Sequence, residues 1–153
     1  MALAIRQTAL ADALVAEGPH PEHAEGLQLF GRFVGEFEGR AVQDVWIVPS
    51  RDRRGEPGLP VSEYGTTIRF FDPRLDVWLV TWCGPVNGAR RIFVARRSGG
   101  DIVQEGLTED GSPMRWLFSE IADDSFSWRS LVSDDGERTW QLREEMHVRR
   151  KAA

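Results

Sequence analysis

Apolar and polar residues alternate through the second half of the chain, between Ile92 and Val148. In the run 126–132, Phe126, Trp128, Ser130 and Val132 share one face, and Ser127, Arg129 and Leu131 point the other way. Segments rich in Gly, Asp and Ser interrupt this alternation about every twelve residues, as short strands joined by tight turns do. These residue types tolerate the left-handed conformations that such turns need. The pattern predicts an antiparallel sheet that curls into a barrel or a sandwich.

The lengths of the turns predict which strand residues lie opposite one another. We expect tight turns at 110–111 and 99–100 and a bulged turn at 134–136. The predicted pairs are Glu105 with Trp116, Val94 with Glu105, and Trp128 with Leu142. The resulting inner face carries the apolar residues Ile92, Val94, Val103, Leu107, Met114, Trp116, Phe118, Trp128, Trp140, Leu142 and Met146.

The chain before the sheet predicts a helical arm, taken as residues 1–35. The segment 2–17 is rich in Ala, Leu and Gln, which favour helix, and Gly18-Pro19 ends it. A second, shorter helix can begin at Pro21. The arm could cap a barrel, pack outside it or mediate dimerisation, and the sequence does not choose among these.

Three strands are predicted between the arm and the alternating half, at 39–48, 64–71 and 77–83. The charged segment 50–60, rich in Gly and Pro, predicts a surface loop or, alternatively, a lid over a cavity. The register of the strand 77–83 is ambiguous. We favour the register that turns Trp78 and Trp82 inward, because burying two indoles stabilises the fold.

About eight strands in residues 36–150 predict an up-and-down barrel with room for side chains or one small ligand. The length of 153 residues predicts a single domain. Six Trp and eight Phe favour an aromatic core or an aromatic-lined cavity.

The charge balance and the cysteine content narrow the classes of partner. A net charge of −5 and a pI near 5.2 disfavour binding to nucleic acid or to an anionic membrane. Cys83 is the single cysteine, which excludes an internal disulfide and fits a reducing cytosol. No apolar run approaches transmembrane length. We therefore expect a cytoplasmic protein.

Three motifs suggest a family. They are Gly39-Arg40-Ala41-Val42-Gln43-Asp44-Val45-Trp46, Gly65-Thr66-Thr67-Ile68-Arg69-Phe70-Phe71-Asp72-Pro73, and Ser133-Asp134-Asp135-Gly136 followed by Thr139-Trp140. They resemble an uncharacterised bacterial family of lipocalin-like, or calycin-type, β-barrels, over about residues 29–150. The resemblance implies the barrel but no activity.

One departure from the family pattern concerns the start of the barrel. The relatives have a Gly-x-Trp strand and a partner strand before the first motif, and the segment 31–39 leaves hardly any room for two strands. The resemblance therefore implies a barrel that is shortened, gapped or completed by a partner chain. An unpaired sheet edge invites strand addition, which favours a homodimer.

Motifs for nucleotide, zinc, calcium or serine-hydrolase chemistry are missing from the sequence. His20 and His23 lie close together beside proline, and His147 is far away in the chain. We predict no metal site and no cofactor. His147 is the position to inspect, because some small barrels hold haem through a lone histidine.

The strongest candidate for chemistry is a pair of carboxylates, Glu105 and Glu144, on the predicted inner face. A carboxylic acid beside an indole in a dry cavity has a raised pKa and can act as a general acid or base. The alternative is a structural carboxylate paired with an arginine. The candidate partners are Arg69, Arg96 and Arg115.

The candidate ligand-binding residues are mostly aromatic. They are Trp116, Trp128, Trp140, Trp78, Trp82, Phe118, Tyr64 and Asp44. Asp44 could accept a hydrogen bond from a ligand, although such residues more often face solvent. The sequence favours binding of a small apolar or aromatic molecule inside the barrel. The alternatives are a cyclase, isomerase or hydratase that uses a cavity Glu, and a dimerising module without a ligand.

Overall fold

A computed structural model describes residues 30, 36–37, 41–49, 53, 55–58 and 63–150. The predicted helical arm, 1–35, lies outside the described residues except for Phe30, whose ring is fully buried. Most of the predicted loop 50–60 lies outside them as well.

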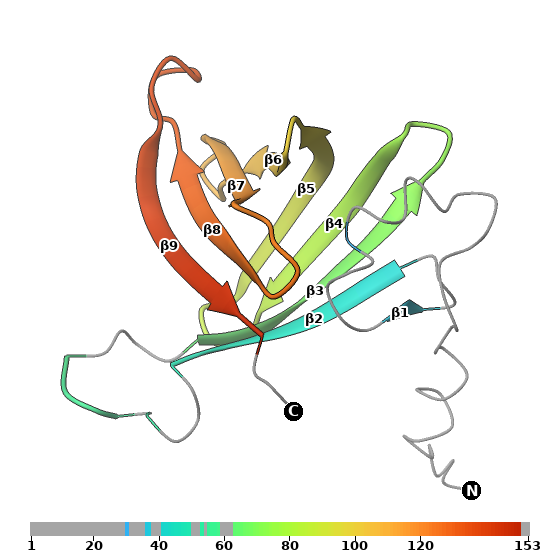
Figure 1. The fold of residues 1–153 in the computed structure, drawn as a ribbon. Coiled ribbons are helices and arrows are strands. Elements are labelled where there is room, and N and C mark those ends of the chain that lie inside the picture. The colour runs from blue at the N-terminus through green and yellow to red at the C-terminus, as the bar shows by residue number, and fades with distance from the viewer. Residues whose placement is uncertain are drawn as a thin grey trace, which may run out of the picture.

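The described part of the chain forms one antiparallel sheet of nine strands in chain order. The strands are β1 Glu36–Phe37, β2 Ala41–Val48, β3 Glu63–Asp72, β4 Val77–Gly84, β5 Ala89–Ser98, β6 Asp101–Leu107, β7 Pro113–Ser119, β8 Ser125–Val132 and β9 Gln141–Arg149. Figure 1 shows the sheet curling so that β8 and β9 stand opposite β2 and β3. The predicted up-and-down β architecture is confirmed.

The curled sheet is a half-barrel rather than a closed barrel. Within the described residues, β9 pairs only with β8, and β2 pairs with β3 and, at one end, with the two residues of β1. The side of β2 beyond Val42 therefore faces β9 across a seam that no ladder among the described residues closes. The resemblance implied a shortened, gapped or partner-completed barrel; the described strands form a half-barrel, and the predicted homodimer stays a prediction.

Turn length accounts for where the predicted registers hold and where they fail. The turn at Gly99-Gly100 pairs Val94 with Glu105, as expected, and Gly99 has the positive φ that this turn requires. The next turn is longer than predicted, because Thr108 and Ser112 close it through the Thr108 amide and the Ser112 carbonyl.

This longer turn shifts the β6–β7 pairing by one residue, so that Gln104 and not Glu105 lies opposite Trp116. A shift of one residue moves a strand's side chains to the opposite face. The inner face of β5 and β6 consequently carries Phe93, Ala95, Ile102 and Gln104. The residues wrongly predicted to point inward, and found on the outer face, are Ile92, Val94, Val103, Glu105 and Leu107.

The connection between β8 and β9 is also longer than the predicted bulged turn. Asp135 accepts hydrogen bonds from Ser133 and Thr139, which organise a loop that extends through Trp140. Trp128 therefore pairs with Met146, and the predicted inward positions of Trp140 and Leu142 are wrong. The irregularity expected in this hairpin lies between Ser130 and Leu131 instead.

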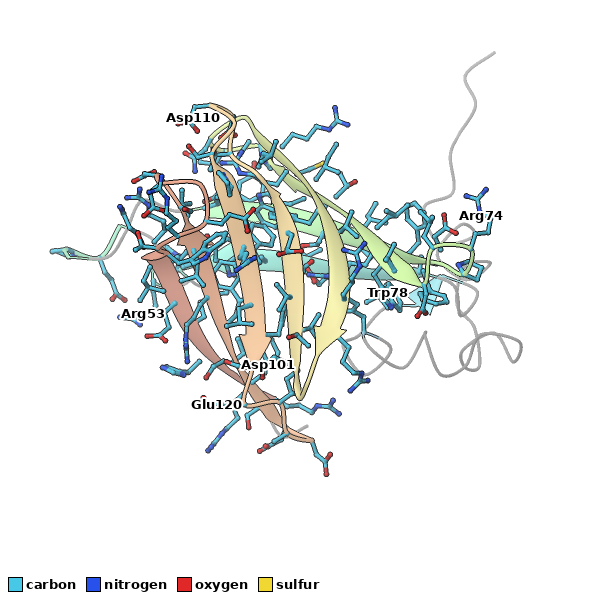
Figure 2. The ribbon with its side chains drawn as sticks, turned by 90° about the horizontal axis from the view of Figure 1, so that it is seen from above. Arg53, Arg74, Trp78, Asp101, Asp110 and Glu120 are labelled. Carbon is cyan, nitrogen blue, oxygen red and sulfur yellow. The ribbon has the colours of Figure 1, made fainter. Side chains whose placement is uncertain are left out.

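The register that turns Trp78 and Trp82 inward is confirmed, because both indoles are buried. With them, the core is made of alternate residues from β2 to β8 and the ring of Phe30. Figure 2 shows that the hairpin turns fall at opposite ends of the strands, with Asp110 at one end and Asp101 and Glu120 at the other. The concave interior lies between these two ends.

Candidate functional site

Four tryptophans form a closed ring of contacts inside the half-barrel. The ring centroids of Trp46 and Trp82 are 5.4 Å apart, and those of Trp82 and Trp116 are 6.0 Å apart. Trp116 and Trp128 follow at 5.3 Å, and Trp128 returns to Trp46 at 5.9 Å. These spacings are typical of interacting aromatic pairs. Since Trp46 lies on β2 and Trp128 on β8, the ring joins the two sides of the open seam.

A glycine on β3, Gly65, allows the four indoles to pack together. The indole of Trp82 extends across the neighbouring strand and lies over Gly65, where a side chain would collide with it. Gly65 also pairs with Trp46, so the absence of a side chain there lets the indoles of β2 and β4 meet. A glycine inside a strand commonly marks such a close approach.

The four indoles border a cavity of about 260 Å³ in the concave interior. Its lining residues are Asp44, Val45, Trp46, Thr67, Arg69, Trp82, Trp116, Phe118, Phe126, Trp128, Met146 and Val148. They come from β2, β3, β4, β7, β8 and β9, so the cavity spans the seam. Small-molecule sites have this composition, a largely aromatic wall with a few polar groups.

The polar groups of the cavity centre on Arg69, whose side chain is 4% exposed and forms a salt bridge with Asp44. The guanidinium carbon lies 5.0 Å from the ring centroid of Phe30 and 5.8 Å from that of Phe118. Burial lowers the pKa of Arg69, and the charge of Asp44 offsets only part of that effect. Among the described residues, the buried Nε of Arg69 has no hydrogen-bond partner.

Five of the predicted ligand-binding residues come together at this cavity: Trp82, Trp116, Phe118, Trp128 and Asp44. Trp78 is buried but lies behind it, with its ring 5.1 Å from Phe30 and 5.9 Å from Phe71. Tyr64 does not line it, since its side chain is partly exposed on the outer face of β3.

Trp140 lies outside the barrel, where it packs under the guanidinium of Arg115 at 4.1 Å. The same guanidinium binds Glu105 at 2.9 Å and Glu137 at 2.9 Å. Glu105 is therefore an exposed, arginine-paired carboxylate on the outer face, and it has no access to the cavity. Glu105 is thus paired with Arg115, as the structural alternative proposed. The pair lies on the outer face and not in the interior.

Glu144 on β9 lies opposite Ser130 on β8, and it does not line the cavity. Desolvation raises the pKa of Glu144, and the negative charge of Glu63 raises it further. The direction agrees with the prediction for an inner-face carboxylate. The two predicted catalytic residues are thus on different faces, and the structure does not bring them together.

The sequence reasoning missed Arg69 as a cavity residue and Trp46 as a ring member. Both lie on the two strands that cross the bottom of the half-barrel (Figure 1). The signal was present in the alternation of β3, where Thr67 and Arg69 share a face with buried positions. Only the pairing of Asp44 with Thr67 across β2 and β3 shows that Arg69 lies beside Asp44.

A second hollow, of about 390 Å³, lies on the outer face near the end of β8. There Ser127 donates a hydrogen bond to Glu120 at 2.5 Å, and its Oγ lies 3.0 Å from Nδ1 of His147. A hydroxyl has one proton, so with Glu120 accepting it, His147 must donate to Ser127 through Nδ1–H. No cluster of three or more metal-ligating side chains occurs in the part of the chain that the structure describes.

Fold and site together define a class: an antiparallel half-barrel with an aromatic cavity and a buried arginine. No family model, curated protein or solved structure matches the chain. The residues described include no helix with the length and apolar character to cross a membrane.

Proposed function

We propose that this protein binds a small aromatic or apolar molecule in the cavity lined in part by Trp46, Trp82, Trp116 and Trp128. The observation that carries the proposal is that these indoles, packed against one another, form part of the wall of a cavity of about 260 Å³. A ligand that fills an empty or poorly hydrated apolar cavity lowers the free energy of the system.

The size of the cavity limits the ligand to one or two fused rings. The position of the cavity at the seam gives such a ligand a way in, because β9 and β2 are not held together by backbone hydrogen bonds in the described residues. Aromatic edges and faces on several sides favour a flat ligand.

Binding is better supported than catalysis. Among the described residues, Asp44 is the only carboxylate that lines the cavity, and it is held in a salt bridge with Arg69. General acid or base chemistry needs a proton-transferring group within hydrogen-bond reach of the substrate. Glu105 is outside, and Glu144 is not among the lining residues.

The test is a titration with naphthalene, indole and related one- and two-ring compounds, followed by tryptophan fluorescence, thermal unfolding and calorimetry. We expect saturable binding at one site and a rise in the unfolding temperature. The variant Met146→Trp places a larger side chain on the cavity wall and should weaken binding at least tenfold. Absence of heat, fluorescence change and thermal shift across the panel would refute the proposal.

Leu142→Trp is the matched control. It adds the same indole on the same strand, but at a position that is 54% exposed and away from the cavity. Its affinity for each compound should equal that of the wild type. Equal weakening by both variants would mean that the ligand binds elsewhere.

A further inference from the structure

We propose that the ligand of this cavity carries a carboxylate, which the guanidinium of Arg69 receives while the aromatic part packs against the indoles of the cavity wall. This inference rests on the proposed function and adds the chemical class of the ligand. It starts from the way in which Arg69 is paired.

Arg69 contacts Asp44 through Nη1. A guanidinium has five N–H donors in a planar fork, and its Nε–Nη2 edge matches the two oxygens of a carboxylate. Two other arginines bind a carboxylate through that edge, whereas Arg91 contacts Glu109 through Nη1. Arg74 binds Asp72 through Nε at 3.2 Å and Nη2 at 2.9 Å, and Arg53 binds Glu56 at 3.1 and 3.0 Å.

The corresponding edge of Arg69 lacks such a partner among the described residues. Its Nε is buried and makes no hydrogen bond to them, and Arg69 lines the cavity. A buried donor without an acceptor costs free energy that an incoming acceptor recovers. The vacant edge is therefore a feature that distinguishes a carboxylate-bearing ligand from a hydrocarbon of the same shape.

Arg69 is much more deeply buried than its anionic partner. Arg69 is 4% exposed, whereas its partner Asp44 is 37% exposed and is screened by water. Desolvation lowers the pKa of Arg69 by more than the charge of Asp44 raises it. A second anionic partner would therefore stabilise the charged guanidinium further. The neighbouring rings of Phe30 and Phe118 both contact the guanidinium, so it is positioned before the ligand arrives.

The lining of the cavity orients the ligand. Thr67 and Arg69 lie two positions apart on β3, facing the interior, and the hydroxyl of Thr67 adds a second donor to this wall. Trp116 and Trp128 belong to β7 and β8 on the other side of the curled sheet. A flat aromatic carboxylate fits with its ring among the indoles and its charge toward β3.

The experiment compares three probes of nearly equal shape by calorimetry at pH 7: 2-naphthoate, 2-naphthamide and 2-methylnaphthalene. Wild-type protein should bind 2-naphthoate at least tenfold more tightly than either neutral probe. Binding of the hydrocarbon as tightly as the carboxylate would overturn this inference and leave the proposed function intact. Failure of all three probes to bind would overturn both.

The variant Arg69→Met combined with Asp44→Asn removes both charges together, because removal of one alone leaves the other unpaired in a partly apolar site. We expect the preference for 2-naphthoate to disappear while 2-methylnaphthalene still binds. Arg129→Met is the control, since it removes a guanidinium that pairs with Glu145 on the outer face at 2.9 Å. A double variant that keeps the tenfold preference would refute the role of Arg69.

A measurement on the unaltered protein covers the case in which the double variant does not fold. The Arg Nε–H resonance of Arg69 should shift on addition of 2-naphthoate and stay in place with 2-methylnaphthalene. An unmoved resonance at saturating 2-naphthoate would contradict the proposed contact.

Discussion

Gly65 on β3 shows how much of the site depends on one missing methyl group. A Cβ at this position would collide with the indole of Trp82 and with the backbone carbonyl of Cys83. Backbone cannot move aside as the end of a flexible side chain can. The close approach of β3 to the Trp82 ring is therefore possible only with glycine.

We predict that Gly65→Ala lowers the free energy of unfolding by about 1–3 kcal/mol, the usual cost of overpacking. It should also weaken ligand binding, because the Trp46–Trp82 contact has to shift. Denaturant unfolding monitored by fluorescence gives the first quantity. Gly100→Ala is the control, since nothing lies within 4 Å of its added Cβ. Equal losses in the two variants would contradict this account.

Asp135 organises the loop between β8 and β9. Hydrogen bonds from Thr139 and then from Ser133 and Arg138 lower the pKa of Asp135 to about 2. These bonds favour the charged form in the folded state. A depressed pKa means that the stabilisation is complete above the unfolded-state pKa and is lost as the pH falls toward about 2.

We predict that Asp135→Asn is less stable than the wild type at pH 7, and that the difference shrinks between pH 4 and about pH 2. Denaturant midpoints of both proteins across this range test the prediction. A difference that is independent of pH would show that the loop depends on the shape of the side chain and not on its charge.

At the level of elements, strand order and the positions of most strands followed from the sequence, because turn-forming residues and alternation are local signals. The β5–β6 register followed too, since a two-residue Gly-Gly turn leaves little choice. The β6–β7 register did not, because Thr108 and Ser112 extend the turn and every side chain of β6 changes face.

The part of the candidate site on β4, β7 and β8 was predictable from the sequence, as was Asp44 on β2. Trp82, Trp116, Phe118 and Trp128 were identified by their aromatic character and alternation. Arg69 was considered only as a partner for a glutamate. Its role depends on the position of β2 beside β3 and on the burial of Phe30, and neither is a local property of the sequence.

Strand β2 offers the element-scale test, because Trp46 is its link to β8 across the seam. Trp46→Ala should lower the free energy of unfolding by about 2–4 kcal/mol, somewhat below the range for fully buried aromatic residues since Trp46 is partly exposed. Val45→Ala on the same strand, at a position 66% exposed, should change it by less than about 0.5 kcal/mol. Comparable losses in both would argue against the bridging role.

For the whole molecule, the cavity is the place where both sides of the half-barrel meet. A ligand there contacts β2 and β3 on one side and β8 and β9 on the other. Anything that binds the folded state alone stabilises it by mass action, by about 2.7 kcal/mol at a ligand concentration 100 times Kd.

We predict that a saturating ligand slows amide hydrogen exchange in β2 and in β9 together, although the two strands share no ladder in the described residues. The β5–β6 turn, none of whose residues lines the cavity, is the internal control, and its amide exchange should slow less. Slowed exchange on one side alone would show that the ligand does not bridge the seam.

The strand order has a further consequence for how the cavity comes into being. Each ladder joins strands that follow one another in the chain, so each hairpin can form early with a small loss of chain entropy. Contact between Trp46 and Trp128 joins distant parts of the chain and belongs to the last stage of assembly. We predict that the pocket forms only after the rate-limiting barrier of folding has been crossed. A bound molecule should leave the refolding rate almost unchanged and act by slowing unfolding, so that its occupancy sets the lifetime of the native protein.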